Sequence, residues 1–230
     1  AGMVAVDAFE VDALRCGERG ALDALPEDKL QPAMLAACAA GEADVVRELL
    51  GRSSVRALLV DDYYPLFIAS TNGHTGVVEV LLAEGAGIDK ADEDGATPLL
   101  QASENGHAEV AAALIGSGAD VNLASDDGAT PLIAASSEGH AEVVTVLVGA
   151  GAKVNDADDD GDTSLIVASE SGHAEVVAAL LVAGANVNLA NKDGNTPLIV
   201  ASDNGHAEVV AALLVAGSNV NLANKDGNTP

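Results

Sequence analysis

Residues 193–225 read DGNTPLIVASDNGHAEVVAALLVAGSNVNLANK, and residues 160–192 nearly repeat them. The two blocks differ only at positions 162/195, 164/197, 170/203, 171/204 and 185/218. The Gly-His pair inside them recurs every 33 residues, which places histidines at His74, His107, His140, His173 and His206. A fixed period of this length is typical of a solenoid, whose repeats stack because none can bury its apolar face alone. The sequence therefore predicts one elongated array.

The first helix of each repeat has clear start and stop signals. Thr196 stands where an N-cap hydroxyl is needed, and Pro197 follows at the first helical position, where its missing N–H costs no hydrogen bond. The equivalent threonines are Thr97, Thr130 and Thr163. Gly205 is expected to end this short helix in a left-handed conformation.

The second helix of the last repeat is predicted over 206–215, and Gly217 is expected to stop it. Apolar residues recur at helical spacing and mark its packed face. The polar segment 218–228 contains Asp-Gly and predicts a β-hairpin-like turn that projects toward the next repeat. The residues of the packed face are Val209, Val210, Leu213 and Leu214.

This block resembles the ankyrin repeat. The matching residues are Asp-Gly-x-Thr-Pro-Leu at 94–99, 127–132 and 193–198, then Gly-His, then Gly-Ala-x-Val-Asn at 151–155 and 184–188. The resemblance implies an all-α, ankyrin-type helical solenoid of about seven stacked repeats with β-hairpin-like turns. The family pattern places a histidine after Thr-Pro-Leu, and we expect apolar packing to replace its polar link here. The residues at that position are Leu100, Ile133, Ile166 and Ile199.

The repeat frame assigns the whole chain, 1–230, to a single array. The ranges 5–28 and 29–60 are degenerate repeats that contain all five arginines, as expected of an N-terminal cap whose outer face must be polar. Regular repeats and the truncated start of an eighth follow. Their ranges are 61–93, 94–126, 127–159, 160–192, 193–225 and 226–230. The last repeat has no successor to cover its apolar face, which predicts end-to-end self-association.

The net charge of -26 disfavours binding partners that are themselves negatively charged. Phosphate groups would be repelled, so we expect no nucleic acid and no membrane as partners. The acidity fits a basic protein partner, and it equally fits a need for solubility or a saline habitat. Composition alone leaves these three explanations open.

The two cysteines, Cys16 and Cys38, are too few for a disulfide framework, and both fall in apolar helical patterns. We expect buried free thiols in a reducing compartment, and therefore a cytoplasmic protein. No apolar run reaches the ~18 residues typical of a transmembrane helix, so no membrane span is predicted.

Two sequence patterns resemble metal-binding sites, but neither has the ligand geometry or the residues that such a site requires. The histidines occur once per repeat, and helices pack about 8–10 Å apart, whereas zinc needs nitrogen ligands at about 2.0–2.1 Å. Residues 156–162 resemble the start of a calcium-binding loop, but Val167 stands where the bidentate Glu is required. We therefore predict no metal, no cofactor and no catalytic residues, and a protein that is not an enzyme.

The resemblance implies that a partner protein or peptide binds along the hairpin tips and the first-helix face. That surface is polar, acidic and varied, while the scaffold is constant. The Val-Asn asparagines (Asn122, Asn155, Asn188 and Asn221) resemble hairpin asparagines that a dioxygenase hydroxylates in some ankyrin proteins, but here we expect them to bond to backbone in the hairpin and to stay unmodified. The positions carried over are Tyr63, Tyr64, Thr71, Asn72, Glu93, Ala96, Glu104, Asn105, Asp126, Ala129, Ser137, Glu138, Asp159, Asp162, Glu170, Ser171, Lys192, Asn195, Asp203 and Asn204.

Tyr63 and Tyr64 stand out because they are adjacent at a hairpin tip, where small or polar residues are usual. Tyrosine is enriched among interface hot spots, which favours a binding anchor. The alternative is that both tyrosines cover the junction between the cap and the array.

Three functions remain open at this point. The chain is interpreted as a non-catalytic protein–protein interaction scaffold. Alternatively, it is the targeting arm of a larger enzyme or effector whose catalytic domain lies outside this sequence. A third alternative is an artificial or orphan array with no dedicated ligand. The fold alone does not choose among them.

Overall fold

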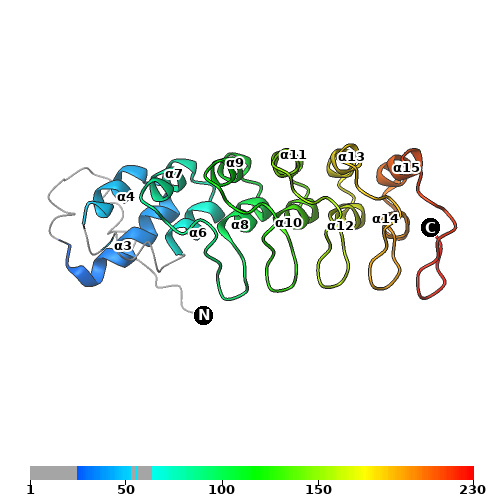
Figure 1. Cartoon of the computed structure of the whole chain (residues 1–230), viewed down its shortest axis with the longest axis horizontal. Coiled ribbons are helices and arrows are strands. Elements are labelled where there is room, and N and C mark those ends of the chain that lie inside the picture. The colour runs from blue at the N-terminus through cyan, green and yellow to red at the C-terminus, as the bar shows by residue number, and fades with distance from the viewer. Residues whose placement is uncertain (1–24, 53–54, 56–63) are drawn as a thin grey trace.

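The computed structural model describes residues 25–52, 55 and 64–230, which form an elongated stack of helix pairs (Figure 1). The described residues form six pairs, and the predicted repeat 5–28 lies almost entirely outside them. Their only β-structure is one isolated antiparallel bridge between Ala157 and Thr163. The helices are α3 (Glu27–Ala40), α4 (Ala43–Leu50), α6 (Tyr64–Thr71), α7 (Thr75–Ala83), α8 (Pro98–Glu104), α9 (Ala108–Gly116), α10 (Pro131–Ser137), α11 (Ala141–Gly149), α12 (Ser164–Ser171), α13 (Ala174–Val182), α14 (Pro197–Asp203) and α15 (Ala207–Val215).

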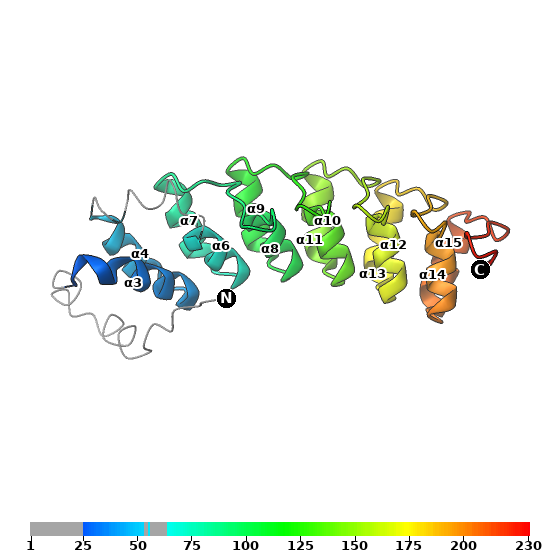
Figure 2. The same cartoon turned by 90° about the horizontal axis from the view of Figure 1, so that it is seen from below.

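The helices form two rows. The first helix of each pair packs on the first helix of the next pair, and the second helices do the same. We call the first row (α3, α6, α8, α10, α12, α14) the inner helices and the second row the outer helices. Five hairpins project to one side, beyond the inner helices (Figures 1 and 2). They comprise residues 91–96, 124–129, 157–162, 190–195 and 223–228.

The predicted N-caps are confirmed. Thr97 Oγ1 accepts a hydrogen bond from the Leu100 N–H at 3.2 Å, and Thr196 Oγ1 accepts one from Ile199 at 3.4 Å. Thr130 and Thr163 cap α10 and α12 in the same way. Because each cap satisfies an N–H that the first helical turn leaves unpaired, these short helices begin at a defined residue.

Each histidine of the 33-residue frame joins two repeats. The His173 ring lies against Gly139 of the preceding repeat, and its Nε2 donates to the Ser137 carbonyl at 2.9 Å. A Cβ on Gly139 would lie 2.6 Å from His173 Nδ1, so only glycine leaves room for the ring. The other four histidines, His74, His107, His140 and His206, repeat both contacts one repeat apart.

Two hydrogen-bond ladders join successive repeats, the first of them through the hairpins. The Asp159 N–H donates to the Asp127 carbonyl at 2.9 Å, and equivalent bonds join each of the other neighbouring hairpins. In the second ladder, the Asn122 and Asn155 side chains accept from backbone N–H groups of the next repeat at 2.9 and 2.8 Å. Asn188 accepts the equivalent bond at 2.8 Å, which confirms the expected backbone bonds for Asn122, Asn155 and Asn188.

The apolar core runs along the whole stack. Leu100, Ile133, Ile166 and Ile199 are at most 6% exposed, which confirms apolar packing where the family pattern places a histidine. The predicted packed face of α15 is only partly buried. Val209 and Leu213 are fully buried, but Leu214 is 45% exposed because no following repeat packs beside it.

Cys38 belongs to this core. It is a free cysteine of α3 with no exposed surface, as predicted, while Cys16 lies outside the described residues. Burial raises the pKa of the Cys38 thiol to about 12. The neutral thiol therefore persists well above neutral pH, and it is the thiolate that reacts as a nucleophile.

We expect Gly139→Ala to lower the free energy of unfolding more than Gly205→Ala does. Both glycines have positive φ, 81° and 74°, and a left-handed conformation costs other residues roughly 1–2 kcal/mol. Only the Cβ at position 139 meets a neighbouring ring, whereas nothing lies within 4 Å of the Cβ at position 205. Urea unfolding followed by circular dichroism measures both losses.

The control for this prediction is His173→Ala, which removes the ring. In that background the two glycine variants should differ less, since only the backbone cost remains. Equal losses for both glycine variants in the unaltered chain would contradict the importance of the ring contact.

We expect Cys38 to react slowly with a thiol reagent in a Cys16→Ser variant, which leaves it as the single cysteine. A pKa near 12 keeps the thiol neutral between pH 7 and 9 in the folded state. Its contribution to stability is complete below the usual thiol pKa of about 8.5 and is lost as the pH rises toward 12. Fast reaction at pH 8 without denaturant would contradict this.

Candidate functional site

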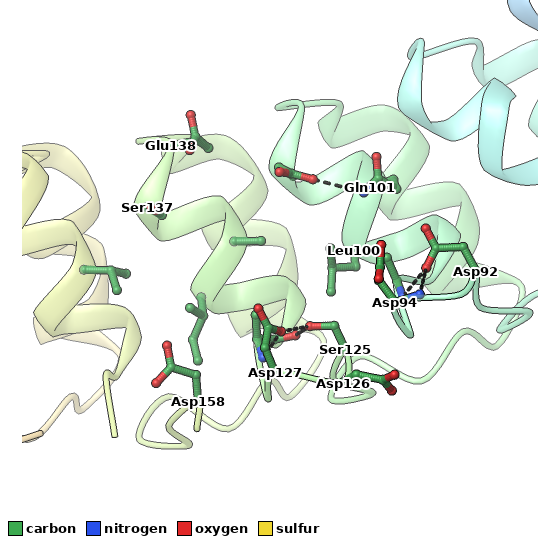
Figure 3. Close-up of a pocket in the computed structure, with 16 residues that line it drawn as sticks. Asp92, Asp94, Leu100, Gln101, Ser125, Asp126, Asp127, Ser137, Glu138 and Asp158 are labelled. Atoms are coloured by element: carbon green, nitrogen blue, oxygen red, sulfur yellow. Dashed lines mark hydrogen bonds between the residues drawn. The ribbon is translucent and has the colours of Figure 1, made fainter. Parts of the chain in front are cut away.

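An open groove lies where the hairpins face the inner helices (Figure 3). It has a volume of about 630 Å³ and spans parts of three consecutive repeats. Its walls are the hairpins 91–96, 124–129 and 157–162 on one side and helices α8, α10 and α12 on the other. The lining residues are Asp92, Asp94, Ala96, Leu100, Gln101, Glu104, Ser125, Asp126, Asp127, Ala129, Ile133, Ala134, Ser137, Glu138, Asp158 and Val167.

Part of the lining is apolar and includes Leu100, Ile133, Ala134 and Val167, of which Leu100 and Ile133 are largely buried. Residues 101, 134, 167 and 200 occupy equivalent positions of successive repeats and are Gln, Ala, Val and Val. Alanine is the smallest of these side chains, so the groove is least filled at Ala134. A difference between repeats at one scaffold position therefore shapes the site.

The polar part of the lining is acidic. Seven of its residues carry carboxylates, and no lysine, arginine or histidine is among the sixteen residues drawn around the groove. The charges come from both walls, because Asp92, Asp94, Asp126, Asp127 and Asp158 lie on hairpins while Glu104 and Glu138 come from α8 and the end of α10. The arrangement suits a cationic ligand with some apolar surface.

The hairpin carboxylates are held by backbone. Asp158 Oδ1 accepts hydrogen bonds from the Asp160 and Asp162 N–H groups at 2.9 and 2.8 Å. Asn191 Oδ1 accepts the equivalent bonds in the next hairpin at 3.0 and 2.9 Å. An uncharged amide therefore closes the same turn, and the charge of Asp158 is not required by the turn geometry.

Asp127 is fixed in a different way. Ser125 replaces the turn carboxylate in this hairpin, and its hydroxyl donates to Asp127 Oδ1 (Figure 3). This bond, together with the Ala129 N–H at 3.3 Å, lowers the pKa of the Asp127 carboxyl. These hydrogen bonds therefore favour the ionised form of Asp127.

Asp162 behaves oppositely. Partial burial raises the pKa of its carboxyl, although a hydrogen bond from Asn191 Nδ2 at 2.8 Å partly offsets the rise. The nearby carboxylates of Asp158, Asp160 and Asp193 add to the rise. The predicted binding residue Asp162 therefore also links two hairpins.

The structure brings six of the predicted site residues into the groove, namely Ala96, Glu104, Asp126, Ala129, Ser137 and Glu138. Ala96 is buried, and Thr71, Asp162 and Asn195 are half-buried. Other predicted positions are exposed but outside the lining. These are Asn72, Glu93, Asn105, Asp159, Glu170, Ser171, Lys192, Asp203 and Asn204.

Several of these predicted residues already serve the scaffold. The side-chain amides of Asn72, Asn105 and Asn204 donate to carbonyls four residues earlier, at 2.8 to 2.9 Å, and so complete the ends of their own helices. Asn195 Oδ1 accepts from Asn224 Nδ2 at 2.8 Å. Sequence reasoning could not separate these roles from binding, because exposed asparagine suits both.

The structure describes one of the two adjacent tyrosines, Tyr64. Tyr63 lies outside the described residues. Tyr64 is the first residue of α6 and is 45% exposed, whereas the threonines at the equivalent position are at most 7% exposed. The side chain that replaces the buried threonine therefore reaches the surface.

Sequence reasoning missed most of the groove lining. The signal was present at 101, 134, 167 and 200, where residue type changes within a nearly constant first helix. The missed residues are Asp92, Asp94, Leu100, Gln101, Ser125, Asp127, Ile133, Ala134, Asp158 and Val167.

Within the part of the chain that the structure describes, no His, Cys, Asp or Glu residues gather into a group that could hold a metal ion. The segment 156–162, which resembles a calcium loop, forms the base and turn of a hairpin. Among the same residues, no helix has the length and apolar character needed to cross a membrane.

Comparison with known families covers nearly all of the described chain. Models of ankyrin repeats in three copies match residues 33–125 and 113–191. A model of ankyrin repeats in many copies matches residues 180–230. A search of curated proteins gives no significant match.

We expect Asp158→Asn to leave stability nearly unchanged and Asp158→Ala to lower it. Asparagine keeps an acceptor for the two turn N–H groups, as Asn191 does, whereas alanine removes both bonds. Each lost bond is worth about 0.5–1.5 kcal/mol. Thermal unfolding compares the two variants, and equal melting temperatures would contradict the role assigned to the turn acceptor.

Proposed function

The chain belongs to the ankyrin repeat family, and on that premise we propose that it is a non-catalytic scaffold that binds a partner protein or peptide along its groove. Ankyrin repeats generally serve as protein–protein interaction modules and are typically not catalytic. The groove between the hairpins and the inner helices is the observation that carries the proposal. Its lining varies between repeats, while the caps, histidines and core leucines do not.

The charge of the groove supports a basic partner. Carboxylates line both walls, and none of the groove-lining residues is cationic. A field of one sign over a concave surface raises the association rate of an oppositely charged partner and falls off with salt. Tyr64 would extend the surface toward the N-terminal cap, with Lys192, Asn195, Asp203 and Asn204 at the other end.

End-to-end self-association has less support. A repeat that stacks on Gly205 in the manner of the array would place a histidine against it and donate to the Asp203 carbonyl. The two degenerate N-terminal repeats carry Glu18 and Glu42 at the histidine position. A carboxylate cannot donate that bond, so a second copy fits the end of the stack poorly.

The test is site-specific photo-crosslinking in a lysate. A benzoylphenylalanine residue replaces Glu138 in the groove or, as the matched control, Thr145, which is exposed on the outer helix α11. We expect crosslinked partners from position 138 that are absent from position 145. Their yield should fall as salt rises past about 0.15 M, where the screening length is near 8 Å.

Two results would contradict the proposal. Equal crosslinking from both positions would show that the groove is not the binding face. Crosslinking from position 145 alone would assign binding to the outer helices.

A further inference from the structure

The hairpins that line the groove are more acidic than the hairpins beyond it. The hairpins 91–96, 124–129 and 157–162 contain three, two and four carboxylates and no lysine or arginine. The hairpins 190–195 and 223–228 instead contain one aspartate and one lysine each, Asp193 with Lys192 and Asp226 with Lys225. The first three hairpins line the groove, and the last two do not. A uniform need for solubility does not account for this distribution.

The groove also has a local hollow. Ala134 occupies the position that Gln101 fills in the preceding repeat and Val167 fills in the next. Gln101 Nε2 donates to Glu104 Oε2 at 3.0 Å (Figure 3), so this side chain is held over its own helix. The space above Ala134 is therefore bordered by an amide on one side and a valine on the other, with Ile133 beside it.

We propose that the hollow at Ala134 is an anchor subsite for one long cationic side chain of the partner, an arginine in preference to a lysine. The inference rests on the function proposed above and adds the chemistry of the ligand at that groove. The methylene stem would lie on Ala134, Ile133 and Val167, and the guanidinium would reach the carboxylates on the walls.

Long cationic side chains combine the two properties that this lining requires. Their methylene groups cover apolar surface while the charged head stays among polar groups. A guanidinium has five donors in a planar fork and is more weakly hydrated than an ammonium, so it engages several carboxylates at a lower desolvation cost. An apolar anchor would leave the carboxylates around it partly desolvated and unpaired.

Two lysines of the array, Lys153 and Lys192, make contacts other than with the carboxylates that line the groove. Lys153 pairs with Asp156 at 3.6 Å, outside the lining. Lys192 contacts the Asp159 carbonyl through Nζ. These two lysines therefore leave the carboxylates of the groove available to a ligand. The hydrogen bonds of Asp127 also favour its ionised form.

The experiment measures binding of a fluorescein-labelled hexa-arginine peptide to the full chain by fluorescence anisotropy at fixed salt. Hexa-citrulline, which is nearly isosteric and uncharged, is the control probe, and hexa-lysine tests the preference between cations. We expect hexa-arginine to bind most tightly and hexa-citrulline to bind least.

The charge variant is Asp92→Asn with Asp158→Asn. Asparagine closes the equivalent turns at Asn191 and Asn224, so the hairpins should keep their shape. The matched control, Asp193→Asn with Asp226→Asn, removes the same charge from hairpins outside the groove. We expect the first pair to weaken hexa-arginine binding about tenfold, as loss of a hot-spot contact does, and the second pair to weaken it far less.

The volume variant is Ala134→Val. Valine is the residue at the equivalent positions of the next two repeats, Val167 and Val200. Ala134→Gln reproduces Gln101 and provides a second variant if the first folds poorly. Filling the hollow should weaken hexa-arginine binding roughly three- to tenfold with the net charge unchanged. Ala112→Val, on the exposed side of the outer helix α9, should have no effect.

Three results would overturn the subsite. They are equal binding of hexa-arginine and hexa-citrulline, equal losses in the two charge variants, and unchanged binding when Ala134 is enlarged. The last two together would indicate diffuse attraction by the whole acidic array. If the subsite fails while crosslinking from position 138 persists, the binding function stands and only the ligand chemistry is wrong. If that crosslinking fails as well, the proposed function fails with it.

Discussion

The contact between each histidine and the glycine of the preceding repeat is the constraint on which the stack depends. It fixes the distance and rotation between neighbours, because the ring fills the space of a missing Cβ and its Nε2 reaches a defined carbonyl. The two hydrogen-bond ladders then follow, because repeats held at a constant distance and rotation bring their hydrogen-bonding groups within reach of each other. The 33-residue period of the sequence thus reflects one histidine–glycine interface that occurs five times along the stack.

A fixed frame leaves certain positions unconstrained. Within the first helix, residues 101, 134 and 167 line the groove and take no part in the caps or the histidine contacts described above, so they tolerate Gln, Ala and Val. The hairpin tips vary for the same reason. Variation at these positions, against constancy at Thr97, His107 and their equivalents, distinguishes the proposed binding surface from the scaffold that supports it.

The sequence predicted the scaffold well and the groove only in part. Helix caps, left-handed glycines and buried leucines depend on local sequence patterns that recur in every repeat. The roles of Thr196 and Gly205 could therefore be predicted from the sequence alone. The groove depends on how neighbouring repeats combine, and Ala134 becomes significant only beside Gln101 and Val167. Asn105 shows the other difficulty, because its exposed amide completes a helix and could equally have been a contact.

The hairpin turns show how charge can be assigned independently of structure. The residue that accepts the two turn N–H groups is Asp92, Asp158, Asn191 or Asn224, and all four make the same bonds at about the same lengths. Stability therefore does not distinguish aspartate from asparagine at this position, apart from the repulsion that aspartates add among themselves. Aspartate stands in two of the hairpins that line the groove, and asparagine stands in both hairpins beyond it. Since the turn requires neither, and repulsion favours asparagine, the turn geometry does not explain the aspartates at the groove, whereas the cationic partner proposed above would.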